Sequence, residues 1–322
     1  MAEILQRAGS WAFDGETVRI VPGTDRSVHH LRKALGEVAV PLQAVAGIAY
    51  EPGGRKGGRL RLRLRDGADP LSQVASGRLA DASDPYQLAV ERDRTGVAEY
   101  VVEEVRNALL LEEVPDTPCD RYLLPGPPVP LTATGTDGTV TFDGERLHIE
   151  WNWIAEESKT SGGPRRFALQ DLAGVDWTPA AGWENGSLRF RPKGTHPTLK
   201  PQHDPNCLLL WGVRQARETG GSVLLAAAVV ARLPHPLAQG GQGGQGGQEE
   251  PGDAPPPALL KGGQGGQGGQ APAVPGPAPA PAEEADHDGL LRRLRELGEL
   301  RESGVLTDDE FRMAKKAILD RF

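Results

Sequence analysis

The tetrapeptide Phe142-Asp143-Gly144-Glu145 occurs twice in this chain, because Phe13-Asp14-Gly15-Glu16 repeats it near the N-terminus. Apolar and polar residues alternate after each copy, in Thr17-Val18-Arg19-Ile20 and in Arg146-Leu147-His148-Ile149. An Asp-Gly pair between alternating segments is a strong signal of a β-hairpin. We therefore expect a strand, a tight turn and a second strand at both positions.

The repeat extends well beyond the two hairpins. Further matches follow in the same order and at a nearly constant offset, namely residues 41–48 with 168–175 and residues 58–63 with 186–191. A period of roughly 20–50 residues indicates a solenoid, whereas this period is as long as a domain. The sequence therefore predicts a mainly β protein with some α-helix, in which two tandem modules occupy residues 9–111 and 135–234.

Each module is expected to end in a helix. Apolar residues recur at helical spacing over residues 96–111, opposite a Glu-rich face. The equivalent segment of the second module, residues 222–233, is almost entirely Ala, Val and Leu. This second helix must be more deeply buried than the first, or buried against the first module.

We interpret residues 22–36 as a loop or short turn, residues 67–83 as a polar insertion, and Gly47 as a candidate β-bulge.

Three further segments separate and follow the modules. Residues 112–134 are rich in Pro and predict an extended linker. Residues 235–287 consist largely of Gln-Gly-Gly repeats and of Pro alternating with small residues, which cannot bury a core and predict a disordered tether. Residues 288–322 predict an α-helical hairpin, because Gly304 ends a Leu-rich segment and a capping box begins at Thr307.

The clearest strand of the sequence is residues 59–65, in which Arg alternates with Leu. Alternation places the Leu side chains on one face of the sheet and the Arg side chains on the other. Two interpretations are open: the basic face binds anions such as phosphate headgroups, or it is a solvated face whose arginines pair with neighbouring carboxylates. The candidate anion-binding residues are Arg59, Arg61, Arg63, Arg65, Arg189 and Arg191.

Net charge and cysteine usage restrict the cellular compartments and the classes of partner that we expect for this protein. The net charge of −8 provides no general attraction for nucleic acid, so no nucleic-acid partner is expected. Cys119 and Cys207 lie far apart, which indicates reduced thiols in an intracellular protein. The N-terminus is no secretory signal, and no apolar stretch is long enough to span a bilayer. We expect a cytoplasmic protein, with peripheral binding to the inner face of the membrane as the alternative location.

Motifs of known catalytic centres are missing from the sequence. It contains no nucleophile elbow, no zinc-protease helix, no Cys-x-x-Cys pair and no dinucleotide fingerprint. The adjacent His29 and His30 make a poor chelate, because neighbouring side chains point in different directions. We therefore expect no enzymatic activity, no metal site and no cofactor.

The predicted C-terminal hairpin carries apolar stripes on two short helices. Two such helices supply too little core for a confident independent fold, so the stripes imply self-association or a protein partner. The expected interface residues are Leu294, Leu297, Leu300, Leu306, Phe311, Ile318 and Leu319.

Two family resemblances add to this interpretation. The C-terminal hairpin resembles the short C-terminal (SHOCT) domain family, in which an interaction or oligomerisation role is suspected; the similar residues are Leu294, Leu297, Leu300, Gly304, Leu306-Thr307, Glu310-Phe311, Lys315 and Leu319. The repeats resemble the bacterial domain of unknown function 4429 at Trp11-x-Phe13-Asp14-Gly15-Glu16, Pro41-Leu42, Gly47-Ile48 and Gly67-Ala68-Asp69-Pro70. The second copy departs from the last motif, with Gly194-Thr195-His196-Pro197. This resemblance implies pleckstrin-homology-like (PH-like) modules, each a small curved β-barrel capped by a helix, and no catalytic residues.

Two functional hypotheses follow from these features. The first is a non-enzymatic binding or scaffold protein that associates through its C-terminal hairpin. The second is a peripheral membrane sensor that binds anionic lipid or phosphate through the arginine-rich strands.

Overall fold

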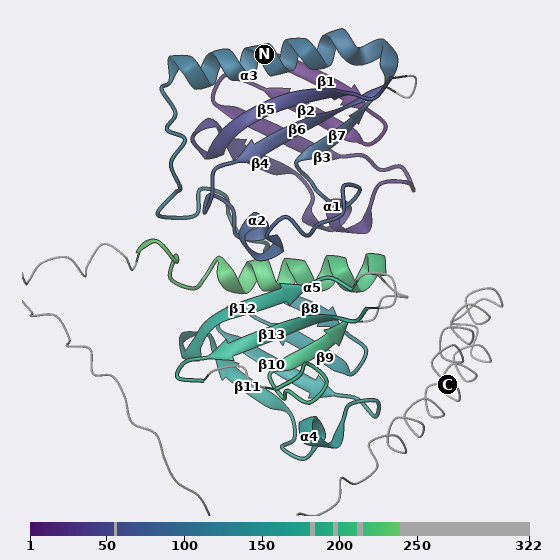
Figure 1. Ribbon diagram of the computed structural model, residues 1–322, viewed down its shortest axis with the longest axis vertical. Coiled ribbons are helices and arrows are strands. Elements are labelled where there is room, and N and C mark those ends of the chain that lie inside the picture. Colours follow the sequence, from purple (N-terminus) through teal and green to yellow (C-terminus); the bar gives the residue numbers. More distant parts are fainter. Residues whose placement is uncertain (55–56, 181–183, 196–198, 211–214, 239–322) are drawn as a thin grey trace, which may run out of the picture. The chain divides into compact units, whose positions relative to one another are not determined.

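The computed structural model describes residues 1–54, 57–180, 184–195, 199–210 and 215–238. The predicted helical hairpin and nearly all of the predicted tether lie outside these residues. Within them the chain is mainly β-sheet with few helices, as predicted, and forms two modules of the same topology (Figure 1).

The first module combines a four-stranded sheet, a three-stranded sheet and a C-terminal helix. The four-stranded sheet contains, in spatial order, β1 (Ala2–Gln6), β2 (Gly9–Phe13), β3 (Thr17–Pro22) and β4 (Val38–Pro41). The three-stranded sheet contains β5 (Val45–Pro52), β6 (Gly58–Leu64) and β7 (Gln87–Val90). The helices are α1 (His30–Leu35), α2 (Pro70–Ala75) and α3 (Thr95–Leu111).

The second module repeats this order. Its four-stranded sheet contains β8 (Leu131–Thr134), β9 (Gly138–Phe142), β10 (Arg146–Trp151) and β11 (Arg165–Ala168). Its three-stranded sheet contains β12 (Leu172–Thr178), β13 (Gly186–Pro192) and β14 (Cys207–Leu210). The helices are α4 (Glu157–Thr160) and α5 (Gln215–Val230).

The closed barrel implied by the family resemblance is absent from the part of the chain that the structure describes. All four sheets are antiparallel, and none closes on itself. The reason lies at the corner between the sheets, where a 3-10 turn (Leu42–Ala44) carries the chain from β4 into β5. A second 3-10 turn (Leu169–Asp171) does the same between β11 and β12. The chain thus leaves one sheet before it enters the next.

The two predicted Asp-Gly hairpins are confirmed, and their turns have the same geometry. Asp14 Oδ1 accepts hydrogen bonds from the backbone N–H groups of Glu16 and Thr17 at 3.0 and 2.8 Å. Asp143 Oδ1 accepts from the equivalent groups at 2.8 and 2.7 Å. These donors stabilise the carboxylates and lower the pKa of both aspartates. Gly15 and Gly144 have φ of +109° and +113°, which only glycine adopts without strain.

The predicted bulge at Gly47 is also confirmed. The register of β5 against β6 shifts between Val45 and Gly47. The second module has the same shift between Leu172 and Gly174 in the pair β12 and β13. The extra residue bends the first strand of each three-stranded sheet and increases its local twist.

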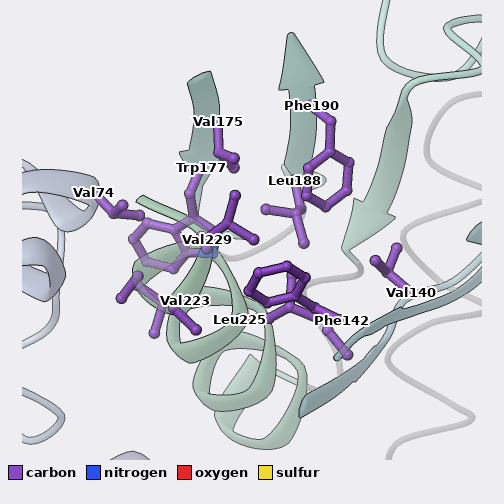
Figure 2. Close-up of a cluster of buried hydrophobic side chains, with 14 of the residues drawn as sticks. Val74, Val140, Phe142, Val175, Trp177, Leu188, Phe190, Val223, Leu225 and Val229 are labelled. Atoms are coloured by element: carbon purple, nitrogen blue, oxygen red, sulfur yellow. The ribbon is translucent and has the colours of Figure 1, made fainter. Parts of the chain in front are cut away.

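Each module has its own apolar core between its sheets and its helix. Trp11, Leu60 and Val101 are buried in the first core. Phe142 and Leu225 are buried in the second, where α5 lies against the sheets (Figure 2).

Four short elements differ from the boundaries that the sequence pattern suggested. Strand β1 lies before residue 9, and strand β8 lies within the predicted linker 112–134. Helix α1 occupies part of the predicted loop 22–36, and helix α2 occupies part of the polar insertion 67–83. None of the helices in the described part of the chain combines the length and the hydropathy that crossing a bilayer requires.

Candidate functional site

The predicted arginine face exists on strand β6, where Leu60 and Leu62 point into the core. Arg59 pairs with Asp81, and Arg61 lies 3.6 Å from Glu51. Arg61 also lies 3.8 Å from Asp81. The hydrogen bond from Arg59 lowers the pKa of Asp81, so this carboxylate stays ionised beside the strand.

The other two arginines of the strand tie the segment after α3 to the sheet. Arg63 lies 3.8 Å from Asp116, and both side chains are exposed. Arg65 Nε donates to the carbonyl oxygen of Thr117 at 2.9 Å, and its Nη1 donates to the carbonyl oxygen of Gln43 at 2.8 Å. These bonds hold the chain at residues 116–117 beside the C-terminal end of β6, the central strand of its sheet.

The equivalent arginines of the second module are paired in the same way. Arg189 Nε lies 3.0 Å from Asp204, which is buried, and Nη2 donates to the carbonyl oxygen of Leu199 at 2.9 Å. Arg191 Nε lies 3.2 Å from Asp176. All six predicted arginines therefore have a carboxylate or carbonyl partner. An incoming anion would compete with these partners, which favours the structural interpretation of the arginine face.

Helix α5 forms the contact between the two modules. It is buried from Ser222 to Val229, and a helix that is apolar all round needs partners on every side. Its inner side packs on β8 and β12, and its outer side contacts α1 and α2 of the first module. Val74 of α2 belongs to the same apolar cluster as Trp177 and Val223, and Figure 2 shows the three side chains together. The sequence left open whether this helix is only more deeply buried than α3 or is buried against the first module, and the structure shows that it is buried against the first module.

The chain beyond α5 returns to the first module. His235 is buried, and its Nε2 lies 3.0 Å from the carbonyl oxygen of Gly67. Its Nδ1 accepts from the backbone N–H of Leu237 at 3.2 Å, which makes Nε2 the protonated nitrogen. The imidazole meets the ring of Tyr122 edge-on at 4.6 Å. These contacts fasten the residues after α5 to the first module.

Two buried polar clusters escaped the sequence analysis. Lys159 is fully buried, pairs with Asp137 and donates to the carbonyl oxygen of Cys207 at 2.7 Å. Burial raises the pKa of the Cys207 thiol to about 11, so this thiol is protonated and unreactive in the folded protein. The second cluster contains Asp69 and Tyr86, joined by a hydrogen bond of 2.8 Å. A sequence offers no signal for a single Lys or Asp that pairs across such distances.

Two further predictions concern a metal site and a partner interface. Among the residues with described positions, no group of His, Cys, Asp or Glu is arranged to hold a metal ion. The predicted interface residues, from Leu294 to Leu319, lie outside the described ranges.

The model of DUF4429, a domain of unknown function, matches residues 11–106 and 140–230, which together make up more than half of the chain. The chain belongs to the DUF4429 family. The two matched segments correspond to the two modules, so the resemblance drawn from the repeats is confirmed. The model of the short C-terminal domain (SHOCT) matches residues 292–319. A search of curated proteins found no match.

The two DUF4429 modules differ at the motif that starts α2. Asp69 is the N-cap of α2 and accepts from the backbone N–H groups of Leu71 and Ser72, while Pro70 occupies the first turn. The second module has Gly194-Thr195-His196-Pro197 at the corresponding place and so lacks the capping aspartate. The motif thus forms the helix with which the first DUF4429 module contacts the second.

Proposed function

We propose that the protein is a non-enzymatic binding scaffold, in which the two DUF4429 modules act as one body and the SHOCT segment associates with itself or with another protein. The observation that carries this proposal is the burial of α5 between its own sheets and helices α1 and α2 of the other module. A shared apolar contact of this kind fixes the two modules as one binding body rather than two independent ones.

The modules are PH-like in this proposal. Four strands, then three strands, then a C-terminal helix is the order in each module, and it supports that assignment. In this proposal the SHOCT segment is the part through which the chain associates with itself or with another protein. Each fully buried Leu or Phe of its apolar stripes contributes roughly 1.5–3 kcal/mol to an intermolecular contact, before the cost of association is subtracted.

The test compares the full chain with a chain that ends at Ala238. This end point keeps the contact of His235 with Gly67 and removes only the residues beyond the tandem modules. Sedimentation velocity should show the shortened chain as a monomer and, if the SHOCT segment self-associates, the full chain as a dimer or larger species. If the segment binds another protein, the full chain should sediment as a complex with the partner that it captures. The cause is the apolar surface that the SHOCT segment contributes.

Point variants assign the association to the SHOCT segment. Leu297→Asp with Phe311→Asp should abolish it, because each charge would be placed in an apolar contact. Leu259→Asp with Leu260→Asp, outside the matched residues 292–319, is the matched control and should leave it intact. A monomeric full chain that also recovers no partner from lysate would refute the proposal.

The alternative of a lipid or phosphate sensor acting through the arginine strands gains no support from their ion pairs. Its test is salt-sensitive binding to anionic vesicles, compared between the natural chain and a variant with Gln at positions 59, 61, 63 and 65. If the natural chain binds the vesicles and this variant does not, the result would support the lipid or phosphate sensor.

A further inference from the structure

A groove of about 620 Å³ lies on the outer face of the four-stranded sheet of the second module. One row of side chains crosses this face, because Thr132 pairs with Thr141, Thr141 with His148, and His148 with Arg166. All four residues line the groove. Neighbouring strands lie about 4.8 Å apart, so the row is about 14 Å long. It places hydroxyl, imidazole and guanidinium groups along a single line.

The arginines of this groove differ from those of the arginine strands. Arg146 and Arg166 are exposed, and neither forms an ion pair or a side-chain hydrogen bond with any residue of the described ranges. Asp143 shares the turn with Arg146 and lines the groove, and its charge interacts with the Arg146 guanidinium, but no hydrogen bond joins these two side chains. Two guanidinium groups therefore face solvent beside a groove with their donors unused.

The imidazole of this groove is also incompletely satisfied. His148 Nδ1 lies 3.7 Å from Glu150, which is too long for a hydrogen bond. His148 Nε2 is buried and has no hydrogen-bond partner among the described residues. Buried polar atoms in native proteins are nearly always paired, so this ring nitrogen keeps the capacity for one further hydrogen bond.

The first module provides an internal comparison. The equivalent row there is Glu3, Ala12, Arg19 and Ala39, as the strand register shows. Arg19 is paired with Glu37 at 3.3 Å, and Thr17 occupies the position of Arg146 after the turn. The duplicated fold thus forms without unpaired cations on this face. The cluster of Arg146, His148 and Arg166 is specific to the second module and is not needed to build it.

We propose that this groove binds an oxyanion, the phosphate or carboxylate group of a ligand, with Arg146 and Arg166 as its principal donors. The planar guanidinium group matches two oxygens of such a group at once, and charge-assisted hydrogen bonds of this kind are strong. His148 is the cross-strand neighbour of Thr141 and of Arg166 and lies two residues after Arg146 on β10, so Thr141 and His148 complete the donor set. The site is separate from the association proposed for the SHOCT segment.

The test uses the full chain and two soluble probes, pyrophosphate and citrate, at low ionic strength. Isothermal titration calorimetry should show saturable binding of at least one probe. Arg146→Thr with Arg166→Ala copies the residues of the first module, so it keeps a surface that this fold tolerates. This variant should bind at least about tenfold more weakly, because it removes both charged donors.

The matched control is Arg61→Thr with Arg63→Ala, which removes the same charge from strand β6. It should retain the affinity of the natural chain. Vesicles of equal parts phosphatidylcholine and phosphatidic acid separate the two sources of the oxyanion. Vesicle binding lost in the groove variant assigns a lipid headgroup, whereas probe binding without vesicle binding assigns a soluble compound. The inference is overturned if neither probe nor vesicle binds, or if the groove variant and the control lose binding equally.

Discussion

Asp69 joins a helix start to a buried hydroxyl group. Its carboxylate accepts from the backbone N–H groups of Leu71 and Ser72 at 3.1 and 2.8 Å and from the hydroxyl of Tyr86 at 2.8 Å. Asp69→Ala should lower the free energy of unfolding by roughly 3 kcal/mol, since it removes an N-cap and leaves a buried hydroxyl unpaired. Urea denaturation measures this loss. The exposed Asp66, changed to Ala, is the control, and an equal loss in both variants would contradict the assignment.

The same residue makes stability depend on pH. Burial raises the pKa of Asp69 above its ordinary value of 3.8, so the folded protein holds this proton more tightly than the unfolded chain. The contribution of Asp69 to stability therefore falls as pH rises from below 3.8 through the folded pKa. Asp69→Asn removes this dependence, so the free energy of unfolding of the variant should rise relative to that of the natural protein as pH increases from about 3 towards neutral.

Urea titrations of both proteins across this range measure the difference. Asp14 and Asp143 have lowered pKa values, so their effect on the pH dependence of stability is opposite to that of Asp69. The stability that they contribute is lost as pH falls. That loss is common to both proteins and cancels in the comparison. A difference that stays constant with pH would show that Asp69 does not titrate in this way.

Elements with a strong local pattern were predictable from the sequence. The Asp-Gly turns, the bulge at Gly47 and the alternation of Leu and Arg in strand β6 each follow from a few neighbouring residues. Helix α3 follows from its apolar spacing, and its charged side is exposed at Glu99 and Glu103. In all these cases the residues that specify the element lie within it.

Short elements whose stability comes from distant residues were missed. Strand β1 spans only Ala2–Gln6, and it forms because its buried side chains pair beside β2. Helix α1 spans His30–Leu35, and Leu31 is buried because the helix lies on α5. Helices of one or two turns are unstable alone, so tertiary packing decides whether they form. Only α2 had a local signal, the Asp69-Pro70 cap, which we interpreted as part of a polar insertion.

The same limit applies to the candidate sites. Alternation fixed which face the arginines occupy, but their pairing depends on residues such as Asp81 and Asp116 in other segments. The groove row is assembled from four different strands, with Thr132 and Arg166 at its two ends. Register across a whole sheet is needed to bring these residues together, and sequence alternation within one strand does not supply it.

At the scale of the whole tandem, the contact between the modules joins two different surfaces and is not symmetric. The outer side of α5 meets α1 and α2, so two different surfaces are joined, and such heterologous contacts continue into chains unless the ends differ. The ends here do differ. Helix α3 exposes Glu99, Glu103 and Arg106 where α5 is apolar, and the second module lacks the motif that builds α2. The contact is therefore specific to this pair of surfaces.

This contact should make the two modules unfold together. Val74 is buried in the cluster that includes Trp177 of the second module, and Val74→Asp places a charge in that apolar contact. The substitution should lower the free energy of unfolding by roughly 3 kcal/mol, through loss of the buried methyl groups and desolvation of the carboxylate. It should also divide one calorimetric transition of the chain ending at Ala238 into two, because each module keeps its own core. Leu111→Asp is the control, since Leu111 is 82% exposed at the end of α3. It should preserve the single transition, and a single transition in both variants would mean that the modules are coupled by something other than the packing of α2 on α5.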